Sequence, residues 1–255
     1  MAAISALQLR EKLTGGVSRV AARRIPFRPH LVNLSAPLVS FSFDDFPLSA
    51  AENAAPILEE YDARGTYYFA GGLAGKLENG RLIAQPEVAA DLAARGHEIG
   101  AHTHSHYNVQ KTPLDVMLKD IEHNIAEVKA VIGAPPVSFA YPYGVVALRS
   151  KLALAGRFVG LRGIETGINA GLMDLAHMQA QELYDASSTI DAMATLLDEV
   201  TRVRGWLIFY THDVETGPSS IGCSPAYFRA VVKLVASRGI EIATVAEGLK
   251  RIGAR

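Results

Sequence analysis

Residues 37–70, PLVSFSFDDFPLSAAENAAPILEEYDARGTYYFA, contain the pattern that decides the fold. Residues 38–43 form a short apolar run typical of a buried strand, and Ser49 with Glu52 has the spacing of a capping box that opens a helix. Gly65 is expected to end that helix, and residues 66–70 again have the composition of a strand. The stretch therefore predicts a strand, a helix and a second strand, the repeating unit of α/β folds.

The same alternation continues along the chain. Pro86 and Gly96 bound the next predicted helix, while Thr112 is the expected cap of the one after it, with Pro113 in its first turn. Further strands are predicted at 97–101, 137–140, 158–161, 206–211 and 240–243, and helices at 86–96, 112–133, 145–155, 188–204 and 224–238. About seven such units favour a closed or nearly closed β/α barrel with parallel strands over a doubly wound open sheet.

The composition is that of one globular domain. The chain has 255 residues, of which 49% are hydrophobic and 20% charged, and its formal net charge is −1. Charges of both signs are interspersed, which argues against binding to nucleic acid or to an anionic membrane. Residues 1–35 have weak periodicity and are expected to form an N-terminal arm with a helix, whereas residues 36–255 carry the barrel.

The sequence also bears on the compartment. Cys223 has no second cysteine for an internal disulfide, so a reducing environment is compatible with the chain. Charged residues from Arg10 to Lys12 interrupt the N-terminus, and no stretch reaches the roughly 18 apolar residues of a membrane span. We therefore expect a cytoplasmic protein without a signal peptide or a transmembrane segment.

Polar and ionisable residues follow several predicted strands. In α/β barrels and open α/β sheets the functional site lies at the carboxyl ends of the strands. The residues at those points are Asp44 and Asp45 after the first strand, residues 102–106 (HTHSH) after the third, residues 141–144 (YPYG) after the fourth, and residues 211–213 (THD) at the end of strand 206–211. These groups are expected to meet on one rim.

Two histidines and one carboxylate on that rim would suit a zinc-like ion, which needs about three protein ligands and an open position for water in a hydrolytic site. His102 and His106 are four residues apart, which would put both imidazoles on one side of a helical turn. Adjacent aspartates also serve as turn formers, and histidine pairs also occur in solvated loops. The coincidence of polar signals at three strand ends, in a chain with eight histidines, favours the metal site.

These motifs resemble those of the polysaccharide deacetylase family, also called the NodB homology domain or carbohydrate esterase family 4. The resemblance extends over about residues 37–250. Its motifs are residues 41–47 (FSFDDFP), residues 96–106 (GHEIGAHTHSH), residues 139–144 (FAYPYG) and residues 210–213 (YTHD). The resemblance implies a distorted (β/α)7-type barrel and hydrolytic removal of acetyl groups, usually from N-acetylglucosamine units, by a catalytic domain at residues 36–255.

The resemblance also implies roles for individual residues. Asp45, His102 and His106 match the ligands of a divalent metal ion, with Zn²⁺ expected and Co²⁺ or Ni²⁺ as alternatives. Asp44 matches the catalytic base that takes a proton from the activated water. By the same pattern, His104 between the two ligand histidines is a spacer.

Two further residues match catalytic groups of the family. The backbone N–H of Tyr143 corresponds to the donor that stabilises the oxyanion, and His212 corresponds to the acid that protonates the departing amine. The family also has an aspartate that tunes the acid histidine. Asp185 and Asp213 are both candidates for that position.

The sequence departs from the family pattern at two places. Ala140 stands where the family has an arginine that holds the base, and alanine can neither bind nor tune a carboxylate. Arg162, at the end of the predicted fifth strand, is our candidate for a replacement that lies beside Asp44. Tyr210 stands where a leucine lines the acetyl pocket, so the shape of that pocket is expected to differ.

Two other functions remain open at this stage. An allantoinase-like amidase or imidase acting on small molecules would share the barrel but would close its pocket around a smaller substrate. An inactive carbohydrate-binding homologue would share the fold without turnover. The presence of Asp44, His212 and all three ligand types argues against the inactive homologue.

Overall fold

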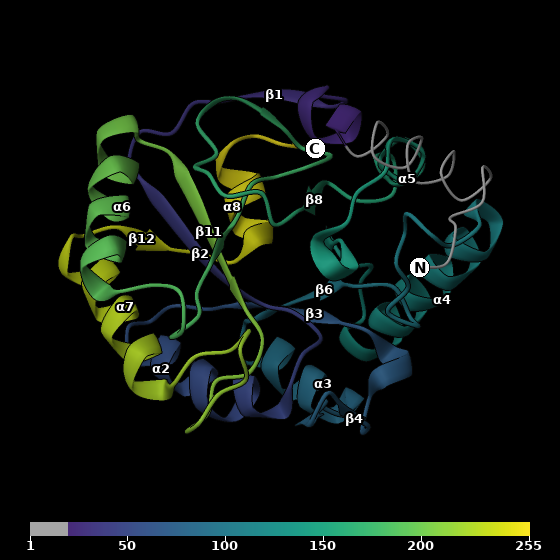
Figure 1. Cartoon of the computed structure of the whole chain (residues 1–255), viewed down its shortest axis with the longest axis horizontal. Helices are drawn as coiled ribbons and strands as arrows, with labels where there is room; N and C mark the ends of the chain where they lie inside the picture. The colour runs from purple at the N-terminus through teal and green to yellow at the C-terminus, as the bar shows by residue number, and fades with distance from the viewer. Residues whose placement is uncertain (1–19) are drawn as a thin grey trace, which may run out of the picture.

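The computed structural model describes residues 20–255, and a curled parallel sheet forms its centre (Figure 1). Seven strands follow one another in the order β10-β11-β2-β3-β6-β7-β8, and β12 also pairs with β2. Their bounds are β2 Leu38–Phe43, β3 Thr66–Phe69, β6 Glu98–Ala101, β7 Ser138–Ala140, β8 Gly160–Arg162, β10 Gln181–Glu182, β11 Trp206–Thr211 and β12 Glu241–Ile242. The predicted parallel α/β arrangement is therefore confirmed.

A short segment contacts both edges of this sheet. The backbone N–H of Met178 donates to the carbonyl of Leu161 in β8 at 2.7 Å, and Gly163 donates to the carbonyl of Met178 at 2.9 Å. A few residues later, β10 pairs in parallel with β11. Residues 178–182 thus connect β8, at one edge of the sheet, with β11 at the other side. The sheet therefore curls into the predicted distorted barrel.

Helices surround the barrel on the outside (Figure 1). The described chain starts with helical residues 20–24, and farther along a π-helical turn, η1 Ala50–Ala54, runs directly into α2 Ala55–Glu59. The other helices on the outside are α3 Pro86–Ala94, α4 Leu114–Ile132, α5 Leu148–Leu154, α6 Ile190–Val203 and α7 Pro225–Ser237. Among residues 20–255, no helix is long and apolar enough to cross a membrane.

The predicted helix starts are partly right. The Ser224 hydroxyl accepts a hydrogen bond from the backbone N–H of Tyr227, with a proline in the first turn. The capping box expected at Ser49 is wrong, because this residue already has helical angles (φ −60°, ψ −29°) and makes no capping bond. Thr112 does not cap α4 either: its hydroxyl donates to the carbonyl of Asn108, and Pro113 precedes the first helical residue.

One helix that we did not predict closes the far end of the barrel. In α8, Val245–Arg251, the first backbone N–H groups donate to side chains at the starts of two strands. Val245 donates to the Thr66 hydroxyl at 2.9 Å, and Ala246 donates to the Glu98 carboxylate at 2.7 Å. Both acceptors lie at the amino ends of their strands, so α8 covers the end opposite the expected site. Thr244 and Glu247 form a capping box there, a signal that the sequence did contain.

Two small antiparallel pairs were also missed. Within the predicted arm, β1 (Pro29–Val32) pairs with β9 (Gly171–Asp174). The glycine-rich loop after β3 contains a second pair, β4 (Leu77–Glu78) and β5 (Arg81–Leu82). Asn79 and Gly80 connect its strands with φ of 49° and 82°, angles that favour an Asn-Gly turn. The predicted N-terminal helix lies mainly outside the described residues.

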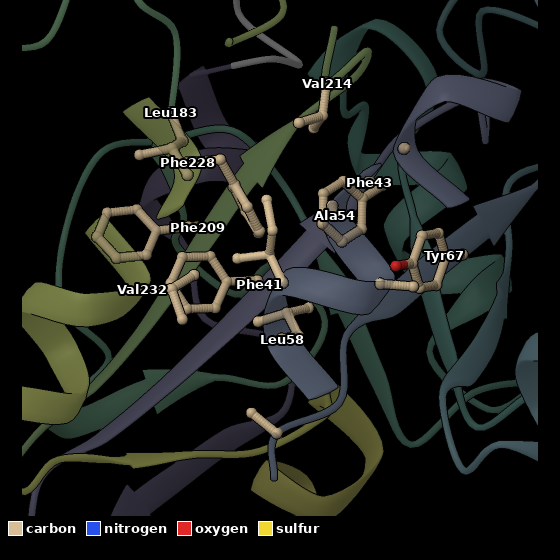
Figure 2. Packing of buried hydrophobic residues seen from close by; sticks show 14 of the residues in the cluster. Phe41, Phe43, Ala54, Leu58, Tyr67, Leu183, Phe209, Val214, Phe228 and Val232 are labelled. Atoms are coloured by element: carbon tan, nitrogen blue, oxygen red, sulfur yellow. The ribbon is translucent and has the colours of Figure 1, made fainter. Parts of the chain in front are cut away.

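Alternation along β2 decides which side chains face the barrel interior. Phe41 points outward and stacks on Phe209 of β11 at 5.3 Å, and it meets Phe228 of α7 edge-on at 5.3 Å (Figure 2). Burial of such aromatic side chains stabilises the sheet-helix interface by about 2 kcal/mol each. Ser42 points inward and donates to the carbonyl of Phe209. By the same period of two, Asp44 is the next inward position, at the carboxyl end of the strand.

A buried histidine next to Met178, in the segment that contacts β8 and β11, makes the stability of the protein depend on pH. His177 is 6% exposed, and its Nε2 has no hydrogen-bond partner among the described residues. Burial lowers the pKa of His177 to about 4. An unfolded histidine has a pKa of about 6.5, so the unfolded chain takes up the proton first. The contribution of neutral, buried His177 to the free energy of unfolding is therefore fully present above pH about 6.5. Up to about 3 kcal/mol of it is lost as the pH falls to about 4.

Urea denaturation at pH 7.5 and at pH 5 measures this loss. The variant His177→Gln cannot take up a proton, so its free energy of unfolding should fall less between the two pH values than that of the wild type. An equal fall in both proteins would contradict the assignment.

Candidate active site

Three predicted metal ligands converge inside the rim of the barrel. Asp45 Oδ1 lies 3.0 Å from His106 Nε2 and 3.4 Å from His102 Nε2. The side chains of Asp45 and His102 are 4% and 1% exposed, and that of His106 is 9% exposed. Both distances are shorter than twice a zinc–ligand bond of about 2.1 Å, so one ion can bridge the donor atoms.

The protonation states also fit a cation. His102 Nδ1 lies 2.8 Å from the carbonyl of Ala140, which can only accept, so Nδ1 carries the hydrogen and Nε2 presents its lone pair toward Asp45. Asp45 Oδ1 is buried without a hydrogen-bond partner among the described residues. A carboxylate oxygen in this state suits coordination by an ion.

The loop that carries the two histidines is not the helical turn that we predicted. Residues 102–106 have no helical assignment, and both Thr103 and His106 have left-handed angles, with φ of 59° and 52°. The Thr103 hydroxyl accepts a hydrogen bond from the backbone N–H of Tyr107 and stabilises the turn. The two imidazoles nevertheless lie 5.1 Å apart, so a different backbone path brings them together.

Helix α4 supports this loop with polar side chains. The Asn124 amide is fully buried, accepts from the backbone N–H of His102 at 3.0 Å and donates to the carbonyl of Phe69 at 3.0 Å. One turn earlier, the Asp120 carboxylate accepts from the backbone N–H of Ser105. The position of His102 therefore depends on a helix that precedes the next strand, not only on β6.

Left-handed backbone angles concentrate at this site. Non-glycine residues rarely adopt them, at a cost of about 1–2 kcal/mol each. Five of the eight such residues in the described chain lie in the three loops around the ligands: Asp45, Phe46, Thr103, His106 and Tyr143. The packing around the rim must hold them in place.

Asp44, the second aspartate of the pair, binds a different cation. Its Oδ1 accepts from Nη2 of Arg162, which is fully buried. Arg162 in β8 is the direct register partner of Ala140 in β7, so the two side chains leave the same face of adjacent strands. Burial disfavours the guanidinium charge, but Asp44 outweighs burial and the pKa of Arg162 is raised. The structure thus places an arginine on the strand beside the one where the motif has it.

Two tyrosine rings enclose this guanidinium. Arg162 Cζ lies 5.1 Å from the ring centre of Tyr68 and 5.2 Å from that of Tyr210. Such contacts favour a desolvated cation by about 2 kcal/mol. Tyr210, which we expected only to reshape the acetyl pocket, therefore also packs against the arginine that pairs with Asp44.

His212, which directly follows β11, faces the same centre. Its Nε2 lies 4.0 Å from Asp45 Oδ2, and its Nδ1 lies 3.1 Å from the carbonyl of Ile221. Because that carbonyl only accepts, Nδ1 carries a hydrogen and Nε2 is the nitrogen that can exchange a proton. Burial lowers the pKa of His212, against the opposing effect of the two aspartates.

The expected aspartate partner of His212 is not seen at either candidate position. The Asp213 carboxylate accepts from the backbone and hydroxyl of Ser219, at 2.7 and 2.6 Å, and Asp185 accepts from the backbone N–H of Ser224 at 2.9 Å. Both carboxylates fix the loop that follows β11. The Ile221 carbonyl takes the place beside the imidazole.

Tyr143 lies on the rim, directly after β7. It belongs to a short 3₁₀ turn, η3 Pro142–Gly144, and has φ of 59°. The residue is 59% exposed, and its ring lies 4.5 Å from the ring of His106. The side chain of Tyr143 therefore lies next to one of the metal-ligand candidates.

Arg81 is a site residue that we did not predict. It comes from β5 of the small hairpin, is 5% exposed, and donates through Nη2 to Asp45 Oδ2 at 3.0 Å. With one oxygen of Asp45 held in this way, the other is left for His102, His106 and an ion. The Asn79–Gly80 turn signalled the hairpin, but no local pattern indicates that Arg81 reaches back to Asp45.

Comparison with known sequences gives matches to deacetylases. A family model described as polysaccharide deacetylase matches residues 32–162. A chitin deacetylase from Colletotrichum lindemuthianum is 24% identical over 127 residues, which covers 49% of this chain and 50% of the relative. The chain thus spans about half the length of that relative.

Comparison with solved structures gives the same fold. A family 4 acetyl xylan esterase from Clostridium thermocellum, solved in complex with a cobalt ion, has a TM-score of 0.61 and 21% identity over 86% of this chain and 93% of its own. The chitin deacetylase from Colletotrichum lindemuthianum has a TM-score of 0.60 and 16% identity, over 88% of this chain and 92% of its own. At these identities the likeness establishes the barrel.

Proposed function

Because the chain belongs to the polysaccharide deacetylase family, we propose that it is a metal-dependent hydrolase that removes N-acetyl groups from an N-acetylglucosamine-type carbohydrate. The observation that carries this proposal is the convergence of Asp45, His102 and His106 beside a second carboxylate, Asp44, that has its own buried cation. A ligand set and a separate proton acceptor within one rim are what metal-assisted hydrolysis requires.

Asp45, His102 and His106 would hold the ion, and two imidazoles with one carboxylate suit Zn²⁺, with Co²⁺ or Ni²⁺ as alternatives. When bound, such an ion polarises a carbonyl and lowers the pKa of water. Arg81 donates a hydrogen bond to the second oxygen of Asp45 and so fixes the orientation of this ligand carboxylate.

The remaining residues would move protons and stabilise charge. Asp44 accepts the proton of the attacking water, with Arg162 orienting its carboxylate from the side. In its doubly protonated form, His212 donates the proton on Nε2 to the departing amine, which leaves a neutral ring whose remaining hydrogen stays on Nδ1 beside the Ile221 carbonyl. The backbone N–H of Tyr143 would donate to the oxyanion; the support for this role is the match of residues 139–144 to the family motif and the contact of the Tyr143 ring with the ring of His106.

The role of Arg162 predicts a change in the pH profile of kcat/KM. Loss of a neighbouring positive charge makes a carboxylate easier to protonate, and a protonated base cannot act. The acidic limb of Arg162→Ala should therefore move to higher pH. Arg157→Ala, which removes a surface arginine that pairs with Glu122, is the control. An unmoved acidic limb in Arg162→Ala would remove this residue from the mechanism.

The substrate class is tested by product analysis. The protein loaded with Zn²⁺ is incubated with N-acetylglucosamine oligomers and, separately, with ureides and cyclic imides. The proposal predicts acetate and an equal amount of free amine from the oligomers. Turnover of only the ureides or imides would favour the allantoinase-like amidase, and an ion-loaded protein without turnover of any of them would be an inactive homologue.

A further inference from the structure

A second group of metal-ligating side chains lies behind the histidine loop. His104, the residue between the two ligand histidines, points to α4 and places Nδ1 2.7 Å from Glu127 Oε2. His123, one turn before Glu127 on the same helix, places Nε2 3.7 Å from Oε1 of the same carboxylate. The two imidazole rings are stacked, with centroids 4.0 Å apart and an interplanar angle of 26°.

We propose that His104, His123 and Glu127 form a second binding site for a divalent transition-metal ion of the zinc type. The donor set is again two imidazoles and one carboxylate, which selects such ions over Mg²⁺ and Ca²⁺. Both distances to Glu127 are below twice a metal–nitrogen bond of about 2.1 Å, so one ion can lie between the donors. The side chain of His123 is 57% exposed, so it can adjust, and water can complete the coordination.

The backbone opposite this cluster is shaped around it. Strand β3 is followed by a 3₁₀ turn, η2 Gly71–Leu73, whose glycines approach the ligands. A Cβ atom on Gly71 would lie 2.4 Å from the Glu127 carboxylate, and one on Gly72 would lie 2.6 Å from the carbonyl oxygen of His104. The Gly72 N–H also donates to that carbonyl at 2.8 Å. Any side chain at Gly71 would displace the Glu127 carboxylate, so the arrangement of the cluster requires glycine at this position.

The two candidate sites are separate but share the same loop. His102 and His106 turn toward Asp45, whereas His104 turns toward α4. On that helix, Asn124 lies next to His123 and binds the backbone N–H of His102. An ion at the second site would therefore join the loop to α4 and hold the backbone that presents the first-site ligands. Its role is structural: it takes no part in the proposed hydrolysis itself and acts only by holding this loop against α4.

Metal stoichiometry tests this site without any measurement of activity. The full-length protein, stripped with a chelator and dialysed, is titrated with Zn²⁺ alone, and bound ions are counted by calorimetry and elemental analysis. The wild type should bind two ions per chain, and His123→Ala should bind one. Glu127→Gln should also bind one, whereas Glu122→Gln, a change to an exposed glutamate on the same helix, should bind two. Equal stoichiometry in His123→Ala and the wild type would overturn the proposal.

A first-site variant separates this proposal from the proposed function. His106→Ala should lose the ion at Asp45 and keep one ion, which a further His123→Ala change removes. If the first site were not a metal site, the wild type would bind a single ion that His106→Ala retains and His123→Ala loses. If the second site were absent, no ion would be lost in His123→Ala. Thermal unfolding gives a second measure, because Zn²⁺ should raise the Tm of His106→Ala but not that of the double variant.

Discussion

Replacing His102 or His106 by alanine is expected to remove the ion from the buried site and to lower kcat/KM for deacetylation by about 10³-fold or more. The ion would supply both carbonyl polarisation and an activated water, a contribution of several kcal/mol. The imidazole of His212 does not replace either ring, because its Nε2 lies 4.0 Å from the opposite oxygen of Asp45, Oδ2.

Metal content and activity are measured together, so that a loss of folding is not mistaken for a loss of ligand. His30→Ala is the matched control, since this histidine contacts the carbonyl of Ile252 away from the rim. Circular dichroism of each variant establishes that the barrel is retained. Full activity in either His102→Ala or His106→Ala would show that these residues are not the ligands.

The second large effect concerns the adjacent aspartates, Asp44 and Asp45, whose substitutions should cause different defects. Asp44→Asn keeps the shape of the side chain and leaves the ligands in place, so metal affinity should be retained while kcat falls by about 10²–10⁴-fold, the usual contribution of a general base. Asp45→Asn replaces an anionic ligand by a neutral one. Its first defect should be weaker metal binding, partly restored by excess ion.

Metal dissociation constants and kcat at saturating Zn²⁺ decide between these roles. Excess ion should do nothing for Asp44→Asn, because the missing step is proton transfer. Equal metal affinity in the two variants, or recovery of Asp44→Asn by added ion, would reverse the assignments.

The barrel could be predicted because its signals are local. Short apolar runs such as residues 38–43, followed by helix caps and glycines, identify each β/α unit, and the carboxyl ends of the strands identify the rim. The ends of helices were less certain. Ser49 and Glu52 have the spacing of a capping box, yet the chain enters a π-helical turn there, with Ser49 already in a helical conformation. Tertiary packing overrides such local preferences.

Residues that reach the site from a distance could be predicted only in part. Arg162 was predicted as a candidate, because it stands at the end of a predicted strand and could replace the arginine missing at Ala140. Its exact placement follows from the pairing of β7 with β8, which sets these two residues opposite each other. Arg81 gave no signal, because its contact with Asp45 depends on how a two-stranded hairpin folds over the rim. Likewise, the spacing of His102 and His106 suggested a helical turn, while left-handed angles at Thr103 and His106 bring the rings together instead.

The central claim, that Asp45, His102 and His106 hold the ion, is tested most directly by anomalous diffraction from crystals loaded with Co²⁺. Data collected above and below the cobalt absorption edge locate the ion without assumptions about ligands. We predict a strong anomalous peak within about 2.0–2.2 Å of Asp45 Oδ1 and of Nε2 of both histidines. Crystals that bind Co²⁺ elsewhere but show no peak between these three side chains would contradict the claim.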